Sequence, residues 1–208
     1  PPLPLRLSVT SLAEYVRCPR RHWLAVQMRL PEPRGDARGG AEPERATTRG
    51  TLAHALLAEV DLQAPPLARR RLLAAAARRR GDDPARPGTR QILDDVARFL
   101  ESPAGQALTA WDRAGSLRRE VPFLLRLPGA PTCYLDGAID ALVVQPEAAH
   151  VLDFKYARYH PGAEERYRVQ LSAYALAASR AAGGLAVRAS LHFLRGVVRT
   201  VDVTPSGE

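Results

Sequence analysis

The stretch from Tyr134 to Lys155 constrains the fold of this chain more than any other part of the sequence. It contains two apolar runs rich in β-branched residues, separated by a short segment with a proline, which is the pattern of a β-hairpin. A four-residue turn at 145–148 sets Asp140 opposite Asp153, with Cβ atoms about 5 Å apart. The sequence therefore predicts a hairpin that carries two facing carboxylates.

The second run of this hairpin holds the triplet Asp153-Phe154-Lys155. Because side chains alternate along a strand, Asp153 and Lys155 should share one face while Phe154 points into the opposite layer. Lys155 is the only lysine among 30 Lys and Arg residues. Arginine holds its proton and presents a planar fork, whereas a lysine ammonium is compact and can titrate. A lone lysine at this position therefore indicates chemistry.

Two carboxylates held side by side repel each other unless a cation lies between them. A hard divalent ion such as Mg²⁺ or Mn²⁺ prefers oxygen ligands, and it can polarise a phosphoryl oxygen or lower the pKa of a bound water. Lys155 would then orient or deprotonate the attacking water. The alternative is a surface ion pair between Asp153 and Lys155. The apolar neighbours Val151, Leu152 and Phe154 argue against that alternative, since a wholly exposed strand should not carry them.

The composition suits one folded domain with a polyanionic partner. A length of 208 residues with 46% hydrophobic composition is ample for a core. The net charge of +8 favours a polyanion, although the same arginines can also be solvated surface charge. Cys18 and Cys133 are too few for a disulfide framework or a zinc site, and no apolar run is long enough to span a bilayer. We therefore expect a cytoplasmic protein without a membrane partner.

The chain changes from helical to strand periodicity after Gly115. A capping box at Ser11 predicts a helix that breaks at Pro19 and resumes, and residues 31–45 should be a mobile loop. The further predicted helices are 49–60, 67–80, 89–100, 103–111 and 164–182, and the predicted strands are 117–127, 134–144, 149–155, 186–194 and 197–203. This order predicts an α/β or α+β protein with a mixed sheet. The helices before Gly115 form a structural layer, a lid or a DNA-facing flank.

Three segments in order carry a resemblance to a known family. They are Gly137-Ala-Ile-Asp140, Asp153-Phe-Lys155 and Gln170-Leu-Ser-Ala-Tyr174. Together they resemble the RecB-like branch of the PD-(D/E)XK nuclease superfamily. Two earlier segments agree: residues 8–24, with Cys18-Pro-Arg20, and residues 49–54, which end at a histidine. Each motif alone is weak, but five in the expected order are strong.

The resemblance implies a restriction-endonuclease-like core and assigns roles that spacing alone does not. By spacing, a lone histidine such as His54 is more often a packed or surface residue. By resemblance, the catalytic residues are Lys155, Asp153 and Asp140, and Mg²⁺ or Mn²⁺ is bound by His54, Asp140, Asp153 and the main-chain carbonyl of Phe154. Gln170 and Tyr174 would support the site and touch the DNA strand, and Glu120 would have a supporting role.

The resemblance also implies domain organisation and partners. We expect one nuclease domain over residues 1–208, mainly helical over 8–111 and with the sheet core over 115–204. The proline-rich start without a methionine predicts a fragment of a longer protein. The implied function is an exonuclease acting on single-stranded DNA in recombination and repair, as in the C-terminal domain of a RecB or AddA helicase-nuclease. The implied partners are DNA, a helicase motor in the same polypeptide and a second helicase-nuclease subunit.

Some members of the branch hold an iron-sulfur cluster with four cysteines. Here no cysteine follows Cys133, so we expect no cluster. Two alternatives to an exonuclease stay open: a catalytically inactive DNA-binding or scaffolding module with the same fold, and a restriction-type endonuclease.

Overall fold

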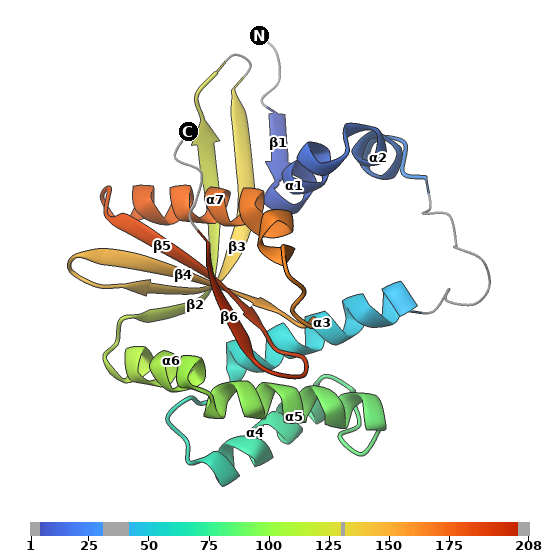
Figure 1. Cartoon of the computed structure of the whole chain (residues 1–208), viewed down its shortest axis with the longest axis vertical. Coiled ribbons are helices and arrows are strands. Elements are labelled where there is room, and N and C mark those ends of the chain that lie inside the picture. Colours follow the sequence, from blue (N-terminus) through green and yellow to red (C-terminus); the bar gives the residue numbers. More distant parts are fainter. Residues whose placement is uncertain (1–4, 31–41, 130–131, 204–208) are drawn as a thin grey trace.

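A mixed β-sheet forms the centre of the molecule (Figure 1). The computed structural model describes residues 5–30, 42–129 and 132–203, and within these ranges the sheet has six strands. They are β1 (Leu5–Ser8), β2 (Leu117–Leu127), β3 (Cys133–Val144), β4 (Ala148–Lys155), β5 (Ala186–Phe193) and β6 (Arg199–Val203). The pairs β1–β3 and β4–β5 are parallel, and β2–β3, β3–β4 and β5–β6 are antiparallel. The predicted mixed sheet is therefore confirmed.

The helices lie in two layers on the two faces of this sheet, as Figure 1 shows. On one side are α1 (Val9–Arg17) and α7 (Ala163–Ala181), and on the other are α3 (Glu42–Glu59), α4 (Pro66–Arg79), α5 (Pro87–Glu101) and α6 (Pro103–Arg113). Two buried cores result, here called the α7 core and the α3–α6 core. Leu73, Phe99 and Leu108 are buried in the α3–α6 core, so the helices of residues 66–113 cover this face of the sheet. None of the described helices is both long and apolar enough to cross a membrane.

Two predictions at the N-terminal side need correction. Strand β1 was not predicted, because four residues in a proline-rich context carry no readable period and become a strand only by pairing with Cys133–Asp136 of β3. The first helix is capped by Ser8, whose Oγ accepts from the N–H of Ser11 at 3.1 Å, and not by Ser11 itself. As expected, it breaks before Pro19, where α2 (Pro19–His22) and the π-helix η1 (Trp23–Gln27) follow.

The predicted mobile loop at 31–45 is only partly within the described residues. Residues 31–41 lie outside them, but Glu42 to Arg45 belong to α3, so the helix begins several residues earlier than predicted. The remaining helix and strand predictions differ from the structure by a few residues at their ends.

The hairpin of β3 and β4 has the register that a four-residue turn requires. Val144 pairs with Ala149, and the ladder continues to Ala141 and Leu152. There it ends, one pair before Asp140 and Asp153. Strand β1 shares the same edge of β3 but pairs only with residues 133–136. The strands on this edge of β3 therefore leave a gap at 137–140, which we call the fork.

In β2 and β3, the alternation of side chains between the two faces of the sheet is interrupted at the fork. In β3, Ile139 packs in the α7 core, whereas Ala141 packs in the α3–α6 core. In β2, Leu125 packs in the α7 core and Leu117 in the α3–α6 core. All four residue numbers are odd. Strict alternation would therefore put both residues of β3 on one face of the sheet, and both residues of β2 on one face. The reversal falls at Glu120 of β2 and Asp140 of β3, which are skipped in an otherwise continuous register.

Candidate active site

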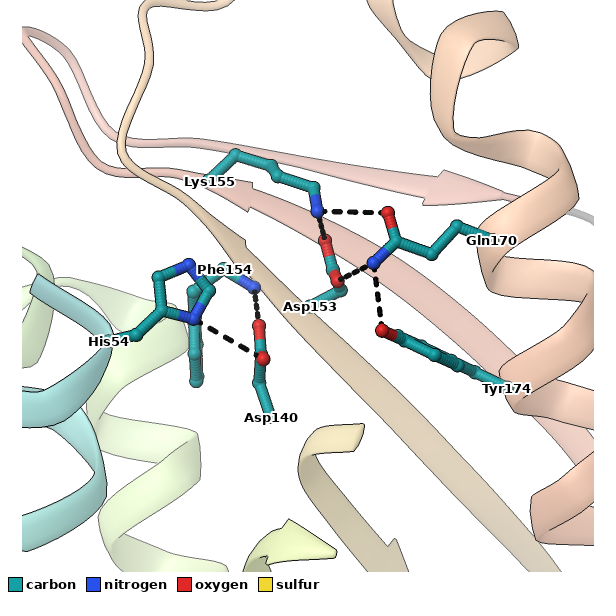
Figure 2. A network of polar contacts seen from close by, with 7 residues as sticks. All are labelled: His54, Asp140, Asp153, Phe154, Lys155, Gln170 and Tyr174. Carbon is teal, nitrogen blue, oxygen red and sulfur yellow. Dashed lines mark hydrogen bonds and ion pairs between the residues drawn. The ribbon is translucent and has the colours of Figure 1, made fainter. Parts of the chain in front are cut away.

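The predicted site residues converge at the fork from four elements (Figure 2). His54 comes from α3, Asp140 from β3, Asp153 to Lys155 from β4, and Gln170 and Tyr174 from α7. The hairpin register brings the two acids near each other, and the two helix layers deliver the histidine and the glutamine from opposite faces of the sheet. Figure 2 shows their polar groups directed toward one another.

The side chain of Asp140 connects β3 to β4 beyond the point where the main-chain ladder ends. Its Oδ2 accepts a hydrogen bond of 2.7 Å from the main-chain N–H of Phe154, and its Oδ1 lies 3.3 Å from Nδ1 of His54. Burial lowers the pKa of His54, but the hydrogen bond and negative charge of Asp140 outweigh burial and raise this pKa above its ordinary value. The helix α3 is thus tied electrostatically to the hairpin.

Glu120, for which only a supporting role is predicted, lies close to both His54 and Asp140. Ligand atoms of His54, Glu120 and Asp140 all lie within 4.8 Å of one another, and within the described ranges these residues form a group that could hold a metal ion. Burial and the charge of Asp140 raise the pKa of Glu120, while His54 opposes them. The backbone of Glu120 has φ of 49°, a strained value for a residue in a strand. Strain and crowded charge together indicate a functional position.

The second acid is held by α7 and by the lysine. Asp153 is 1% exposed, and burial raises its pKa to about 6, with Lys155 opposing and Asp140 adding to the effect. Its Oδ2 lies 2.7 Å from Nζ of Lys155 but makes no hydrogen bond of good geometry. Its Oδ1 accepts from Nε2 of Gln170 at 3.3 Å. Asp153 and Lys155 share one face, as predicted, while the side chain of Phe154 lies in the α3–α6 core.

Gln170 connects the acid, the lysine and Tyr174. Its Oε1 accepts from Lys155 Nζ at 3.1 Å, and its Nε2 lies 2.9 Å from the hydroxyl of Tyr174. The Tyr174 side chain is buried at 5% exposure and packs edge-on against Phe123. In this geometry the hydroxyl of Tyr174 holds the Gln170 amide, and the contact of these two residues with the DNA strand stays a prediction.

Tyr167 is a site residue that sequence reasoning missed. The lysine Nζ lies 4.5 Å from the centre of its ring, within the range of a cation–π contact. Tyr167 precedes Gln170 by three residues and Tyr174 by seven, so all three share one face of α7. This spacing was visible in the sequence, but an aromatic residue at helical spacing is usually core. Only the position of Lys155 distinguishes the two cases.

The donor set fits a hard divalent cation. Carboxylates and one imidazole gather where the sheet opens, and the buried Oδ2 of Asp153 lacks a well-formed hydrogen bond. Divalent ions with oxygen preference are bound by such groups. Asp153 lies outside the compact group of His54, Glu120 and Asp140, because its carboxylate is drawn toward Lys155 and Gln170.

Comparison with known proteins agrees with the fold. The sequence model of the PD-(D/E)XK nuclease superfamily matches residues 6–204. The chain therefore belongs to this superfamily.

Among similar proteins are two bacterial ATP-dependent helicase/nuclease subunits A. The protein of Listeria welshimeri is 25% identical over 171 residues, or 73% of this chain, and that of Bacillus cereus strain AH820 is 28% identical over 172 residues, or 71% of this chain. The chain spans about 14% of the length of each. A crystal structure of a candidate exonuclease from Eubacterium rectale has a TM-score of 0.55 at 12% identity, covering 96% of this chain and 73% of that one. That likeness supports the fold.

Proposed function

We propose that this chain is a divalent-metal-dependent deoxyribonuclease, an exonuclease that hydrolyses single-stranded DNA during recombination and repair. The observation that carries the proposal is the convergence of Asp140, Asp153, Lys155 and His54 at the fork, where one buried carboxylate oxygen has no well-formed hydrogen bond. The names of the similar helicase/nuclease subunits support the same assignment.

The proposed cofactor is Mg²⁺ or Mn²⁺. Its proposed ligands are His54, Asp140, Asp153 and the main-chain carbonyl of Phe154, and the proximity of Glu120 to His54 and Asp140 adds it as a candidate. Such an ion, when bound, polarises a phosphoryl oxygen and lowers the pKa of a bound water. Burial, to which the charge of Asp140 adds, raises the pKa of Asp153 and of Glu120, and the positive charge of a bound ion would oppose both effects.

Lys155 is the group proposed to orient or deprotonate the attacking water. Its side chain is 15% exposed, and Asp153, Gln170 and the ring of Tyr167 fix its ammonium from three sides. A positioned ammonium can orient the water and stabilise negative charge on the leaving oxygen without reorganising. Arginine would not fit this role, because its fork is wide and its proton is not released.

The proposed partners follow from charge and from the relatives. A net charge of +8 favours DNA. By analogy with the helicase/nuclease subunits, a helicase motor would belong to the same polypeptide and feed single strands to the site, and a second helicase-nuclease subunit would complete the assembly. The proposed location is the cytoplasm.

The test is incubation of the purified chain with end-labelled linear single-stranded, linear duplex and circular DNA in Mn²⁺, Mg²⁺ or EDTA. We expect degradation of linear single strands that requires the metal and is abolished by Asp153→Ala. The matched control is Asp136→Ala, an acid of β3 whose partner is Arg6 at the edge of the sheet. Absence of metal-dependent cleavage by the wild-type chain would overturn the nuclease, and defined fragments from circular DNA would indicate an endonuclease.

A further inference from the structure

An open cavity of about 550 Å³ adjoins the candidate metal ligands along α3. Its lining residues are Gly50, Thr51, His54, Ala55, Ala58, Arg80 and Glu120. His54 and Glu120 belong to the group at the fork, so the cavity opens directly onto the site. It therefore lies where a substrate chain would continue beyond the reacting group.

The side of the cavity formed by α3 carries mostly small side chains. Four of its five lining residues are small, and the positions 50, 51, 54, 55 and 58 follow one helix face. A Cβ added at Gly50 would meet nothing within 4 Å, so this part of the wall borders open space. From Gly50 to Ala58 the helix advances about 12 Å.

The cavity is also lined by one positively charged side chain, Arg80, which is not part of the group at the fork. Arg80, the residue directly after α4, pairs with Glu59 at the end of α3, and Arg79 pairs with the same carboxylate at 3.5 Å. One glutamate cannot neutralise two arginines, so this trio keeps a net positive charge. Of the two arginines, Arg80 lines the cavity and Arg79 does not.

We propose that this cavity binds the DNA strand next to the cleaved phosphodiester, and that Arg80 contacts a backbone phosphate there. The inference rests on the proposed function, because it assumes that the fork is the reacting centre. The volume of this cavity lies within the range of ligand-binding clefts in proteins. Arginine is the side chain best suited to phosphate, and its planar fork can hold two phosphate oxygens. The small residues of α3 let the strand approach the helix closely.

The test compares Arg80→Glu with Arg79→Glu in single-stranded DNA binding and cleavage. Both variants change the charge by the same amount and break one ion pair to Glu59, so non-specific electrostatics and local stability are matched. Binding of a fluorescent oligonucleotide is followed by anisotropy in EDTA, where no cleavage occurs, and cleavage is followed in Mn²⁺. We expect Arg80→Glu to weaken binding at least tenfold and Arg79→Glu less than threefold.

A second variant, Ala58→Trp, fills the cavity without changing charge. With folding verified by circular dichroism, it should also weaken oligonucleotide binding and slow cleavage. Equal losses for Arg80→Glu and Arg79→Glu, or full binding by Ala58→Trp, would overturn the proposal. No binding by the wild-type chain would overturn it as well. If the wild type binds but never cleaves, the nuclease assignment fails, and the comparison of the two arginines still decides whether the cavity is the DNA site.

Discussion

The main-chain N–H of Phe154 donates a 2.7 Å hydrogen bond to Oδ2 of Asp140. A side chain thus holds the two strands together where their ladder stops after Ala141 and Leu152. The same carboxylate lies 3.3 Å from His54, so Asp140 fastens the fork while its charge faces the candidate metal site.

Asp140→Asn should separate the structural role of Asp140, which accepts a hydrogen bond from Phe154, from its role as a candidate metal ligand. The amide oxygen can still accept from Phe154, so we expect a stability loss of about 1 kcal/mol by urea unfolding. The lost charge should weaken Mn²⁺ binding at least tenfold in isothermal titration. The control is Asp136→Asn, on the same strand, whose carboxylate pairs with Arg6 and not with His54. Unchanged Mn²⁺ affinity in Asp140→Asn would remove this acid from the metal site.

Tyr167 should position the lysine through its ring. Tyr167→Phe keeps the aromatic face, whereas Tyr167→Leu removes a cation–π contact worth about 1 kcal/mol. We expect the leucine variant to lower kcat about fivefold and to shift the pH profile of cleavage, with Mn²⁺ affinity unchanged. The phenylalanine variant should retain both properties of the wild type. If the two variants behave alike, the ring acts only as packing.

Arg119 should hold the histidine-bearing helix in place. Its Nη1 donates to the carbonyls of Leu57 and Val60 at 3.0 and 2.7 Å, at the C-terminal end of α3. Arg119→Met removes these bonds and should cost about 2–4 kcal/mol in unfolding free energy. Arg118→Met loses bonds to the carbonyls of Gly115 and Leu117, which are close to it in the chain, and should cost less than about 1 kcal/mol. Similar losses in both variants would contradict this role.

His192 should make the fold sensitive to acid. Its ring is buried between Ser190 and Thr200, and burial, with a smaller effect of His150, lowers its pKa from 6.5 to about 3. The unfolded chain therefore takes up this proton first, and the stability contribution present above pH 6.5 is lost as the pH falls toward 3. Between pH 7 and pH 5, the wild type should lose about 2 kcal/mol more unfolding free energy than His192→Gln. Equal losses on acidification would show that His192 does not titrate in this way.

The hairpin was predictable because its information is local. A four-residue turn fixed the register of β3 and β4, and alternation placed Lys155 beside Asp153 and Phe154 in the opposite core. The role of His54, by contrast, came from resemblance, since nothing in its own helix predicts that this residue lies beside Asp140.

The missed features all depend on distant contacts. β1 forms because part of one edge of β3 is free to pair with it, and the face reversal involves Glu120 of β2 and Asp140 of β3 together. Tyr167 becomes part of the site only through Lys155, and the cavity joins Ala58 of α3 with Arg80, which follows α4. No periodicity in one segment contains such information.

Cleavage of end-labelled single-stranded DNA in Mn²⁺ by wild type, Lys155→Ala and the nearby exposed Arg158→Ala tests the central claim most directly. A general acid–base or water-orienting group contributes about 10²–10⁴-fold to rate. We predict at least a hundredfold loss for Lys155→Ala, with oligonucleotide affinity changed less than threefold, and a near wild-type rate for Arg158→Ala. Cleavage by Lys155→Ala at the wild-type rate, with contaminating nuclease excluded by an inactive Asp153→Ala preparation, would contradict the account.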